Sequence, residues 1–289
     1  MKPAIQKSSI PEEKIFVAKE LREKHFDPIW HSHREYQLFV VVKGTGTRFI
    51  GNTVKSFAAG DITFLGPGVP HLWRSDASYF NKNSRQRIHG LVIYFREGFI
   101  GDLLEKEEMQ QVRGLFKKAA RGIEYSVEMA HTMTDRIKEL IGTHGTASLI
   151  GLLQILDTLS VAKDFHLLHN ETYSYKLNES ETQRINIVYN YAAQHFQNNI
   201  ALEQVAKLLN MTPTSFSRYF KMKTSKSFSD FLSELRIRHA CKLLVEDDRK
   251  SINQISNVCG FNTLSNFNRQ FKVFMQMTPR EYREQFSVL

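Results

Sequence analysis

The sequence is poor in cysteine and proline, and it has no long apolar run. Its 289 residues include two cysteines, Cys241 and Cys259, and seven prolines. Two cysteines build no disulfide framework and lack the paired spacing of a zinc site, so we expect buried reduced thiols. The most apolar stretch, residues 147–162, is too short to span a bilayer and includes Gln154 and Asp157. Residues 1–14 have no apolar core like that of a signal peptide. We therefore expect a cytoplasmic protein without a membrane partner.

Acidic residues are fewer than basic ones, and most of the basic excess lies in the C-terminal part of the chain. The chain has 30 Asp and Glu against 39 Lys and Arg, a net charge of +9. From Ser180 onward there are 15 basic and 9 acidic residues, so this part carries +6 of the total. A basic C-terminal part suits an anionic partner such as nucleic acid.

A short unit occurs twice near the C-terminal end. The pattern Phe-x-Arg-x-Phe-Lys at 216–221 returns 51 positions later at 267–272. Each copy reads as a short helix, a tight turn and a second helix, which is the outline of a helix-turn-helix. Helical spacing of apolar residues across 228–246 predicts a connecting helix of roughly 28 Å. A connecting helix of this length could hold the second helices of the two copies, the recognition helices, about one DNA turn apart, roughly 34 Å.

This tandem resembles the DNA-binding domain of AraC/XylS-type transcription regulators. The resemblance covers about 110 residues. It implies a DNA-binding domain of two helix-turn-helix units. The chain departs from the family at Ser225 and Gln276, where Gly commonly follows each recognition helix. The second copy carries the family signature at Ile252, Ile255, Gly260, Phe261, Phe267, Arg269, Phe271, Lys272, Thr278, Pro279, Tyr282 and Arg283.

The two recognition helices offer eight candidate DNA-binding side chains. Arg can read guanine and Asn adenine, while Ser and Thr are permissive and Lys more often reaches phosphates. Arg218 and Arg269 have a rival role in intradomain ion pairs, because both recur identically while target half-sites usually differ. The candidates are Thr214, Ser217, Arg218 and Lys221 in the first copy and Ser265, Asn268, Arg269 and Lys272 in the second.

The first hundred residues read as short strands separated by glycine turns. Many short strands of this kind indicate a small sandwich or barrel. Two groups of residues here resemble the two cupin motifs, and a cupin-like sensor domain is common at the N-terminus of AraC-type regulators. The first group is His31, His33, Gln37 and Gly44, and the second is Gly60, Gly68 and His71. The predicted strands are 15–21, 36–43, 47–50, 61–65, 70–74 and 88–95.

The histidines allow three interpretations. They could ligate a metal in a cupin enzyme, line an effector site, or fill the interior of the barrel. Side chains alternate between the two faces of a strand. His31, His33 and Gln37 would therefore share one face of their strand, and His71 would share a face of its own strand with Trp73. A carboxylate usual in metal-binding cupins is replaced by Gln37. We therefore expect no metal and no cofactor, and an organic effector such as a sugar stacked on Trp73.

From residue 99 to residue 165 the pattern turns helical. Helices are predicted at 107–121, 127–143 and 146–163. The third carries an apolar stripe near heptad spacing, which either packs on the barrel or forms a homodimer seam. The stripe is Leu149, Leu152, Leu153, Leu156 and Leu159. Residues 166–179 read as an interdomain linker.

These patterns predict an α+β two-domain protein. Residues 1–165 form a cupin-like effector-sensing β-barrel followed by dimerisation helices, 166–179 the linker, and 180–289 the tandem helix-turn-helix domain. We expect a homodimeric, non-enzymatic regulator that binds double-stranded promoter DNA under the control of a small-molecule effector. An activator role with RNA polymerase as partner is the expectation, although the sequence does not decide between activation and repression. The alternative is a metal-dependent cupin enzyme with a DNA-binding appendage.

Overall fold

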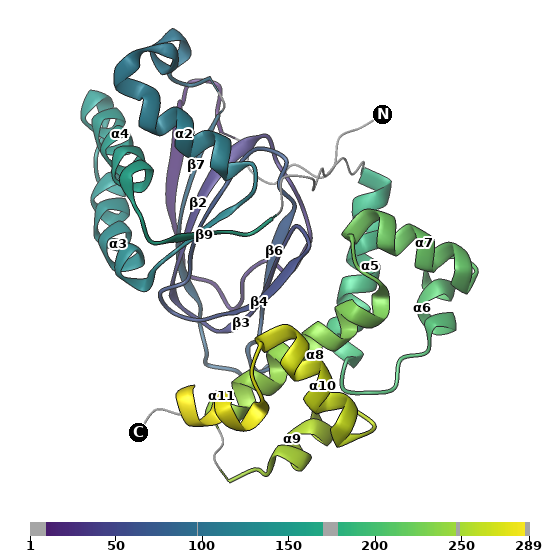
Figure 1. The fold of residues 1–289 in the computed structure, drawn as a ribbon. Coiled ribbons are helices and arrows are strands. Elements are labelled where there is room, and N and C mark those ends of the chain that lie inside the picture. The colour runs from purple at the N-terminus through teal and green to yellow at the C-terminus, as the bar shows by residue number, and fades with distance from the viewer. Residues whose placement is uncertain (1–9, 97, 170–178, 247–248, 287–289) are drawn as a thin grey trace. The chain divides into compact units, whose positions relative to one another are not determined.

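The computed structural model describes residues 10–96, 98–169, 179–246 and 249–286. The chain divides into two compact units, one up to Glu179 apart from residues 54–56, and one from Ser180 onward. The first unit is rich in strands and the second is helical (Figure 1), which confirms the predicted α+β fold class. Among the described residues, no helix combines the length and apolar character needed to cross a bilayer.

Two sheets form the first unit. The larger has the strand order β1-β7-β2-β5-β8-β9 and the smaller β4-β3-β6. The described strands do not close on themselves, so the predicted barrel is an open pair of sheets. The strands are β1 (Phe16–Leu21), β2 (Glu35–Lys43), β3 (Gly46–Ile50), β4 (Thr53–Phe57), β5 (Ile62–Leu65), β6 (His71–Ser75), β7 (His89–Arg96), β8 (Ile123–Tyr125) and β9 (Phe165–Leu167).

The central strand β2 is covered on both faces. Leu38 and Val40 belong to a core shared with the helices, while Phe39 and Val41 belong to a second core with residues of the smaller sheet. Gln37 has the parity of Phe39, so it faces the space between the sheets. Helices α2, α3 and α4 lie against one side of the larger sheet (Figure 1). Their bounds are α2 (Gln110–Ala119), α3 (Val127–Ile141) and α4 (Gly145–Val161), with α1 (Ala77–Phe80), η1 (Gly101–Glu105) and η2 (Glu107–Met109) before them.

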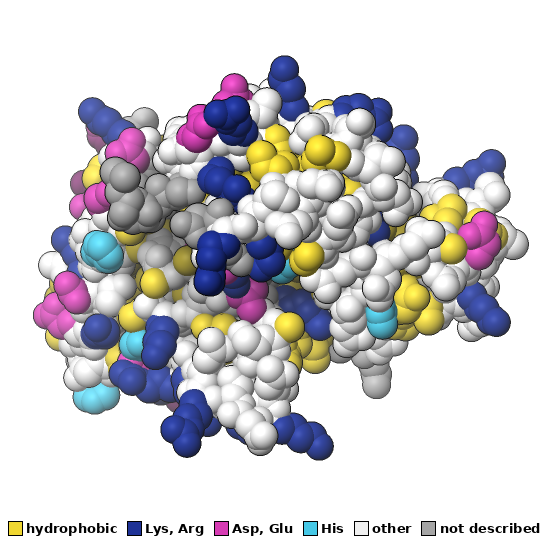
Figure 2. All heavy atoms as spheres, turned by 90° about the horizontal axis from the view of Figure 1, so that it is seen from below, with side chains coloured by type: hydrophobic (Ala, Val, Ile, Leu, Met, Phe, Trp, Pro, Cys, Tyr) yellow, Lys and Arg dark blue, Asp and Glu magenta, His cyan; other side chains and the backbone are white. Residues whose placement is uncertain are grey.

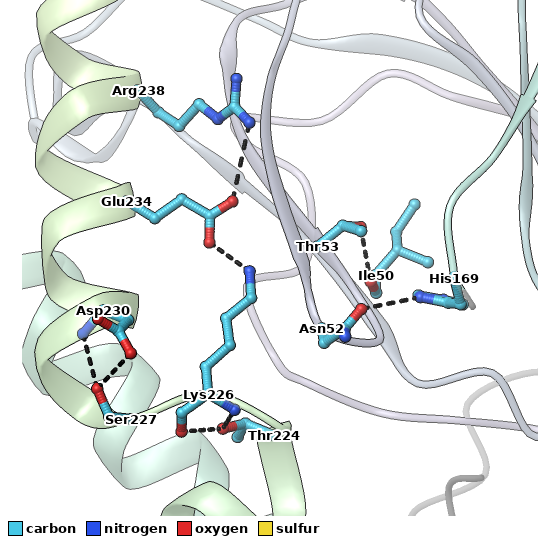
Figure 3. A network of polar contacts seen from close by, with 10 residues as sticks. All are labelled: Ile50, Asn52, Thr53, His169, Thr224, Lys226, Ser227, Asp230, Glu234 and Arg238. Atoms are coloured by element: carbon cyan, nitrogen blue, oxygen red, sulfur yellow. Dashed lines mark hydrogen bonds and ion pairs between the residues drawn. The ribbon is translucent and has the colours of Figure 1, made fainter. Parts of the chain in front are cut away.

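Residues 165–169 form an ordered segment of the first unit. Strand β9 pairs with β8, and Leu168 is buried in the core between the sheets. His169 follows, and its Nδ1 lies 3.2 Å from the side-chain oxygen of Asn52 (Figure 3). The predicted linker therefore begins too early, because its first residues belong to the sheet and the core. Residues 170–178 of that linker lie outside the described part of the chain.

Helices α5–α11 build the second unit. The connecting helix spans residues 228–246, as its apolar spacing predicts. Each copy of the repeat places a short helix before a recognition helix of twelve residues, α7 in the first and α10 in the second. The bounds are α5 (Glu179–His195), α6 (Leu202–Leu208), α7 (Pro213–Thr224), α8 (Phe228–Glu246), α9 (Ile252–Val258), α10 (Leu264–Met275) and α11 (Pro279–Phe286).

Helix α8 joins the two copies because buried residues recur from its first turn to its last. Near its start, Phe228 and Phe231 pack on Phe220 of α7, and Phe231 also stacks on Tyr189 of α5. Near its end, Ile237, Ala240, Cys241 and Leu244 pack with residues of α9 and α10. Burial raises the pKa of Cys241 to about 11 and that of Cys259 to about 12, so both stay thiols near neutral pH.

Candidate functional site

Three histidines from separate segments meet in the first unit. The backbones of His31 and His71 pair through two hydrogen bonds of 3.1 and 2.8 Å, which brings the segment before β2 alongside the start of β6. His33 lies two residues further on, and its ring centroid is 5.0 Å from that of His71. One ring nitrogen from each histidine lies within 4.8 Å of the other two. All three side chains are buried.

Backbone carbonyls fix the tautomer of each ring. Nδ1 of His31 donates to the Ile29 carbonyl at 2.7 Å, and Nδ1 of His71 donates to the Val69 carbonyl at 2.8 Å. Nδ1 of His33 lies 3.0 Å from the Glu35 carbonyl. A carbonyl oxygen only accepts, so the ring proton sits on Nδ1 and the lone pair on Nε2 in each neutral ring. Nε2 of His71 is buried without a hydrogen-bond partner among the described residues.

Burial keeps the rings of His33 and His71 neutral. Burial lowers the pKa of His71 well below its usual value, and the neighbouring His31 and His33 lower it further. Burial also lowers the pKa of His33, although Gln37 and Glu35 oppose the shift. A neutral imidazole offers a lone pair to a ligand, whereas an imidazolium does not. The cluster is therefore chemically a set of converging nitrogen acceptors.

Gln37 completes the cluster, and Trp73 borders it. The Gln37 side-chain oxygen lies 3.0 Å from His33 Nε2. Trp73 is 5% exposed and packs edge-on against Phe39, with its ring centroid 5.5 Å from that of His71. The structure thus brings all five predicted residues together. Trp73 lies in the core between the sheets, and the ring of Phe39 packs against it.

Two residues near the cluster were missed from the sequence. Glu35 is buried, and its carboxylate oxygen lies 3.5 Å from His33 Nδ1. Tyr94 of β7 pairs with Gln37 in register, and its ring lies 5.3 Å from that of His33. The register of β2 and β7 decides which side chains meet, and one strand read alone does not reveal it. The alternation within β7 does indicate that Tyr94 faces inward like Val92.

The recognition helices α7 and α10 have matching ends. Thr212 and Thr263 cap them, each side chain accepting from the backbone N–H three residues on, at 3.2 Å. In both helices the phenylalanines four residues apart are fully buried. The eight predicted DNA-binding residues are all exposed: Thr214, Ser217, Arg218, Lys221, Ser265, Asn268, Arg269 and Lys272. Each helix thus has one face in the core and one face toward solvent.

The two arginines differ in their surroundings. The Arg269 guanidinium donates to the Asn266 side-chain oxygen at 3.1 Å. Within the described part of the chain, Arg218 has no hydrogen bond and neither arginine has an ion pair. The rival role of both residues in intradomain ion pairs therefore has no geometric support in the described residues.

Both arginines of α8 act within their own domain. Arg236 donates to the carbonyls of Phe196 and Asn198 at 2.7 and 2.8 Å, which fastens the end of α5. Glu234 is buried between Lys226 and Arg238 and pairs with both (Figure 3). The Arg238–Glu234 separation is 3.8 Å. These contacts favour a structural role for the two arginines over contact with the DNA backbone.

Two apolar side chains that are more than half exposed were missed in the recognition helices. Met222 is 69% exposed and Val273 is 58% exposed. They occupy the same position of the repeat, one turn after Arg218 and Arg269, and so lie on the same helix face as these arginines. Apolar side chains in a major groove contact thymine methyl groups. The 51-residue offset of the repeat was a signal that could have revealed the pair.

Comparisons with known proteins match one family model to each part of the chain. A family model described as an AraC-like ligand binding domain matches residues 16–150, and one described as a helix-turn-helix domain matches residues 205–285. The chain belongs to the AraC family of transcription regulators. Neither matched family model is that of an enzyme.

Several relatives of this AraC-family chain are known. The Msm operon regulatory protein of Streptococcus mutans is 22% identical over 260 residues, covering 86% of this chain and 84% of that protein. An uncharacterized HTH-type transcriptional regulator of Staphylococcus aureus is 26% identical over 155 residues, or 53% of this chain. The match spans only 20% of that regulator's length. The solved structure of ToxT from Vibrio cholerae is 13% identical, with a TM-score of 0.37, over 96% of this chain and all of ToxT.

Lys and Arg side chains of this AraC-family regulator project from its surface in several places on the face drawn in Figure 2. They belong to a chain whose net charge is +9. A positive surface attracts duplex DNA without regard to sequence and makes binding depend on salt.

Substitution by glycine just after the C-terminal end of each recognition helix should stabilise the domain. Ser225 and Gln276 both have φ of 58°, in the left-handed region. That region costs an L-residue about 1–2 kcal/mol, and the greater unfolded-state entropy of glycine offsets part of the gain. We expect Ser225→Gly and Gln276→Gly each to stabilise the domain by roughly 0.5–1 kcal/mol. Ser229→Gly within α8 is the matched control and should destabilise instead. Equal losses in all three variants, measured by urea unfolding, would contradict the assignment.

Proposed function

We propose that this protein binds duplex promoter DNA in a sequence-specific manner through α7 and α10, under the control of a small-molecule effector. The observation that carries the proposal is the pair of recognition helices with matching caps and a shared polar face. Thr214, Ser217, Ser265 and Asn268 contact bases in this proposal, together with the two arginines. Lys221 and Lys272 lie on the same exposed surface and reach phosphates, which position the protein without specifying sequence.

The effector site is the buried cluster in the first unit. His31, His33, Gln37 and His71 present nitrogen and oxygen atoms that point toward one another, which supports a ligand-binding role. Trp73 supports these side chains by packing. A stacked sugar, the ligand expected from the sequence, finds less support because Trp73 lies in the core with Phe39.

Three further parts of the proposal rest on the family. The protein acts in the cytoplasm, contacts RNA polymerase at its promoter, and works as a homodimer. The predicted seam needs revision, because Leu152, Leu156 and Leu159 are buried in their own core. The exposed side of α4 is left for a partner copy, and it includes Ile150 and Val161, at 51% and 57% exposure. A groove of about 600 Å³ between α3 and α4 borders Ile150.

We expect Ile150→Glu to convert the dimer into a folded monomer, because a carboxylate on an apolar seam loses its hydration on association. Sedimentation velocity at micromolar concentration measures the result. Lys163→Glu, beyond the end of α4, is the control and should stay dimeric. A wild-type protein that sediments as a monomer at this concentration would remove the dimer from the proposal.

Selection of bound duplexes from random DNA tests the proposed function directly. The proposal expects an enriched motif with two separate conserved blocks, one for each recognition helix. Substitution of Arg218 should alter one block and substitution of Arg269 the other. Recovery of unrelated sequences at equal affinity would show that the protein binds DNA only through charge.

A further inference from the structure

We propose that Met222 and Val273 recognise the 5-methyl groups of thymine, one in each half of the bound DNA site. Met222 belongs to α7 and Val273 to α10. This role rests on the proposed function, to which it adds two base-reading residues and the chemical group that each of them contacts.

The first observation is the exposure of these two side chains. Met222 is 69% exposed and Val273 is 58% exposed, the two highest values for a large apolar side chain in the described part of the chain. They lie 51 positions apart and so occupy one position of the repeat. Exposed apolar side chains that are scattered singly need no explanation. Recurrence in both copies points to a contact that both copies make, and the two recognition helices share DNA as their partner.

The second observation is the charge around each apolar side chain. Lys221 precedes Met222, and Lys272 precedes Val273, and both lysines are exposed. An apolar protein surface that covered Met222 or Val273 would also remove water from the neighbouring ammonium group, which is costly. A duplex avoids this cost, because its phosphates pair with the lysines while the base edges in the groove meet the apolar side chains.

Thymine is the base whose edge suits such side chains. In the major groove the other edge groups that distinguish the bases are hydrogen-bond donors and acceptors, whereas thymine alone presents a methyl group. An isopropyl group has no donor or acceptor, and a thioether is only a weak acceptor. Met222 and Val273 therefore discriminate between base pairs by burying the methyl group.

Helix geometry places the thymine relative to the base read by the arginine. Met222 follows Arg218 by four residues, and Val273 follows Arg269 by four. Four residues correspond to about 6 Å along a helix, and successive base pairs are about 3.4 Å apart. We therefore expect the thymine about two base pairs from the guanine that each arginine contacts, with the same separation in both halves of the site.

The two side chains differ in stiffness, and the two halves of the site should differ accordingly. Val273 is branched at Cβ, which restricts its rotamers. Met222 is unbranched, with three rotatable bonds, and adapts to an irregular surface. The half-site of α10 should therefore fix thymine at one position, whereas that of α7 should accept it at either of two adjacent positions.

Replacement of each thymine in a selected duplex by deoxyuridine tests the proposal, because it removes the methyl group and keeps the hydrogen-bonding edge. We expect the full-length protein to bind about fourfold more weakly for one such replacement in each half-site, the factor that corresponds to burying one methyl group. Met222→Ala should abolish the loss in one half-site and Val273→Ala in the other. Both residues are exposed and alanine favours helices, so both variants should fold.

Leu208→Ala and Val258→Ala are the matched controls. These residues are 41% and 43% exposed and recur 50 positions apart in α6 and α9, outside the recognition helices. Both variants should keep the full effect of deoxyuridine. Met222→Leu should also retain it, because leucine is apolar, whereas Met222→Gln, of similar length but polar, should lose it.

Equal affinity for thymine and deoxyuridine at every position would overturn the proposal, as would losses that persist unchanged in Met222→Ala and Val273→Ala. An enriched motif without any effect of deoxyuridine removes this inference alone and leaves the proposed function standing. Selection that enriches no motif removes the proposed function and this inference with it.

Discussion

Gly260→Ala should destabilise the DNA-binding domain by roughly 2–5 kcal/mol. Gly260 follows the first helix of the second copy with φ of 83°, where an L-residue is strained. A Cβ at this position would lie 2.6 Å from the Gln197 carbonyl oxygen and 2.8 Å from that of Phe196. Both neighbours are backbone, and Arg236 donates to the Phe196 carbonyl at 2.7 Å. The clash therefore meets a fixed segment that has little freedom to move away.

Hydrogen exchange of the amides in α8, α9 and α10 measures this loss within one domain. Tryptophan fluorescence is the internal check, because Trp30 and Trp73 both belong to the first unit and should report an unchanged stability. Asn210→Ala is the matched control. Asn210 holds the equivalent turn of the first copy at φ of 54° and already has a Cβ, so only a small loss is expected. Similar exchange rates in Gly260→Ala and Asn210→Ala would show that a Cβ close to the carbonyls of Phe196 and Gln197 does not destabilise the domain.

Arg218→Ala should change which sequences are bound, at a cost of roughly 1–3 kcal/mol on the preferred site. The side chain is exposed on α7 and makes no hydrogen bond or ion pair within the described residues, so the variant leaves the fold intact. Losing a bidentate contact to guanine relaxes the preference at one position of the site. Affinity for the preferred duplex and for single-base variants, measured by fluorescence anisotropy, gives the change in preference.

Lys221→Ala is the control for this prediction, because Lys221 lies one turn further along α7 and is proposed to contact phosphate. It should weaken binding to all duplexes about equally. The slope of log affinity against log salt concentration should fall by about one, because one phosphate contact is lost. Arg269→Ala extends the comparison to the second copy, where Asn266 holds the guanidinium. If Arg218→Ala also weakens all duplexes by the same factor, its assignment to base recognition is wrong.

Local patterns predicted the C-terminal domain well. Residues 228–246 form the predicted connecting helix, because helical periodicity is decided by residues only a few positions apart. The sequence did not predict the left-handed conformations of Ser225 and Gln276, because neither residue is the glycine common at these positions. Helix capping by a hydrogen bond back to Lys221 and Lys272 holds them there despite the missing glycines.

Long-range pairing limited the prediction of the N-terminal domain. Strands β4, β8 and β9 were missed, since β8 and β9 have three residues each and exist only by pairing across the sheet. The parity of His71 and Gln37 was correct, yet parity does not show that their side chains share one centre. The lone-pair directions depend on carbonyls of Ile29, Glu35 and Val69, and no sequence pattern reveals which carbonyl a ring will meet.

Hydroxyl-radical footprinting of the full-length protein on a selected duplex tests the central claim most directly. Two recognition helices joined by α8 predict two protected segments centred about 10 base pairs apart on one face of the duplex. Methylation interference should place both contacts in the major groove, and substitutions in α7 and in α10 should each remove one of them. A single protected segment that is unaffected by substitutions in one of the two helices would contradict the tandem recognition of DNA.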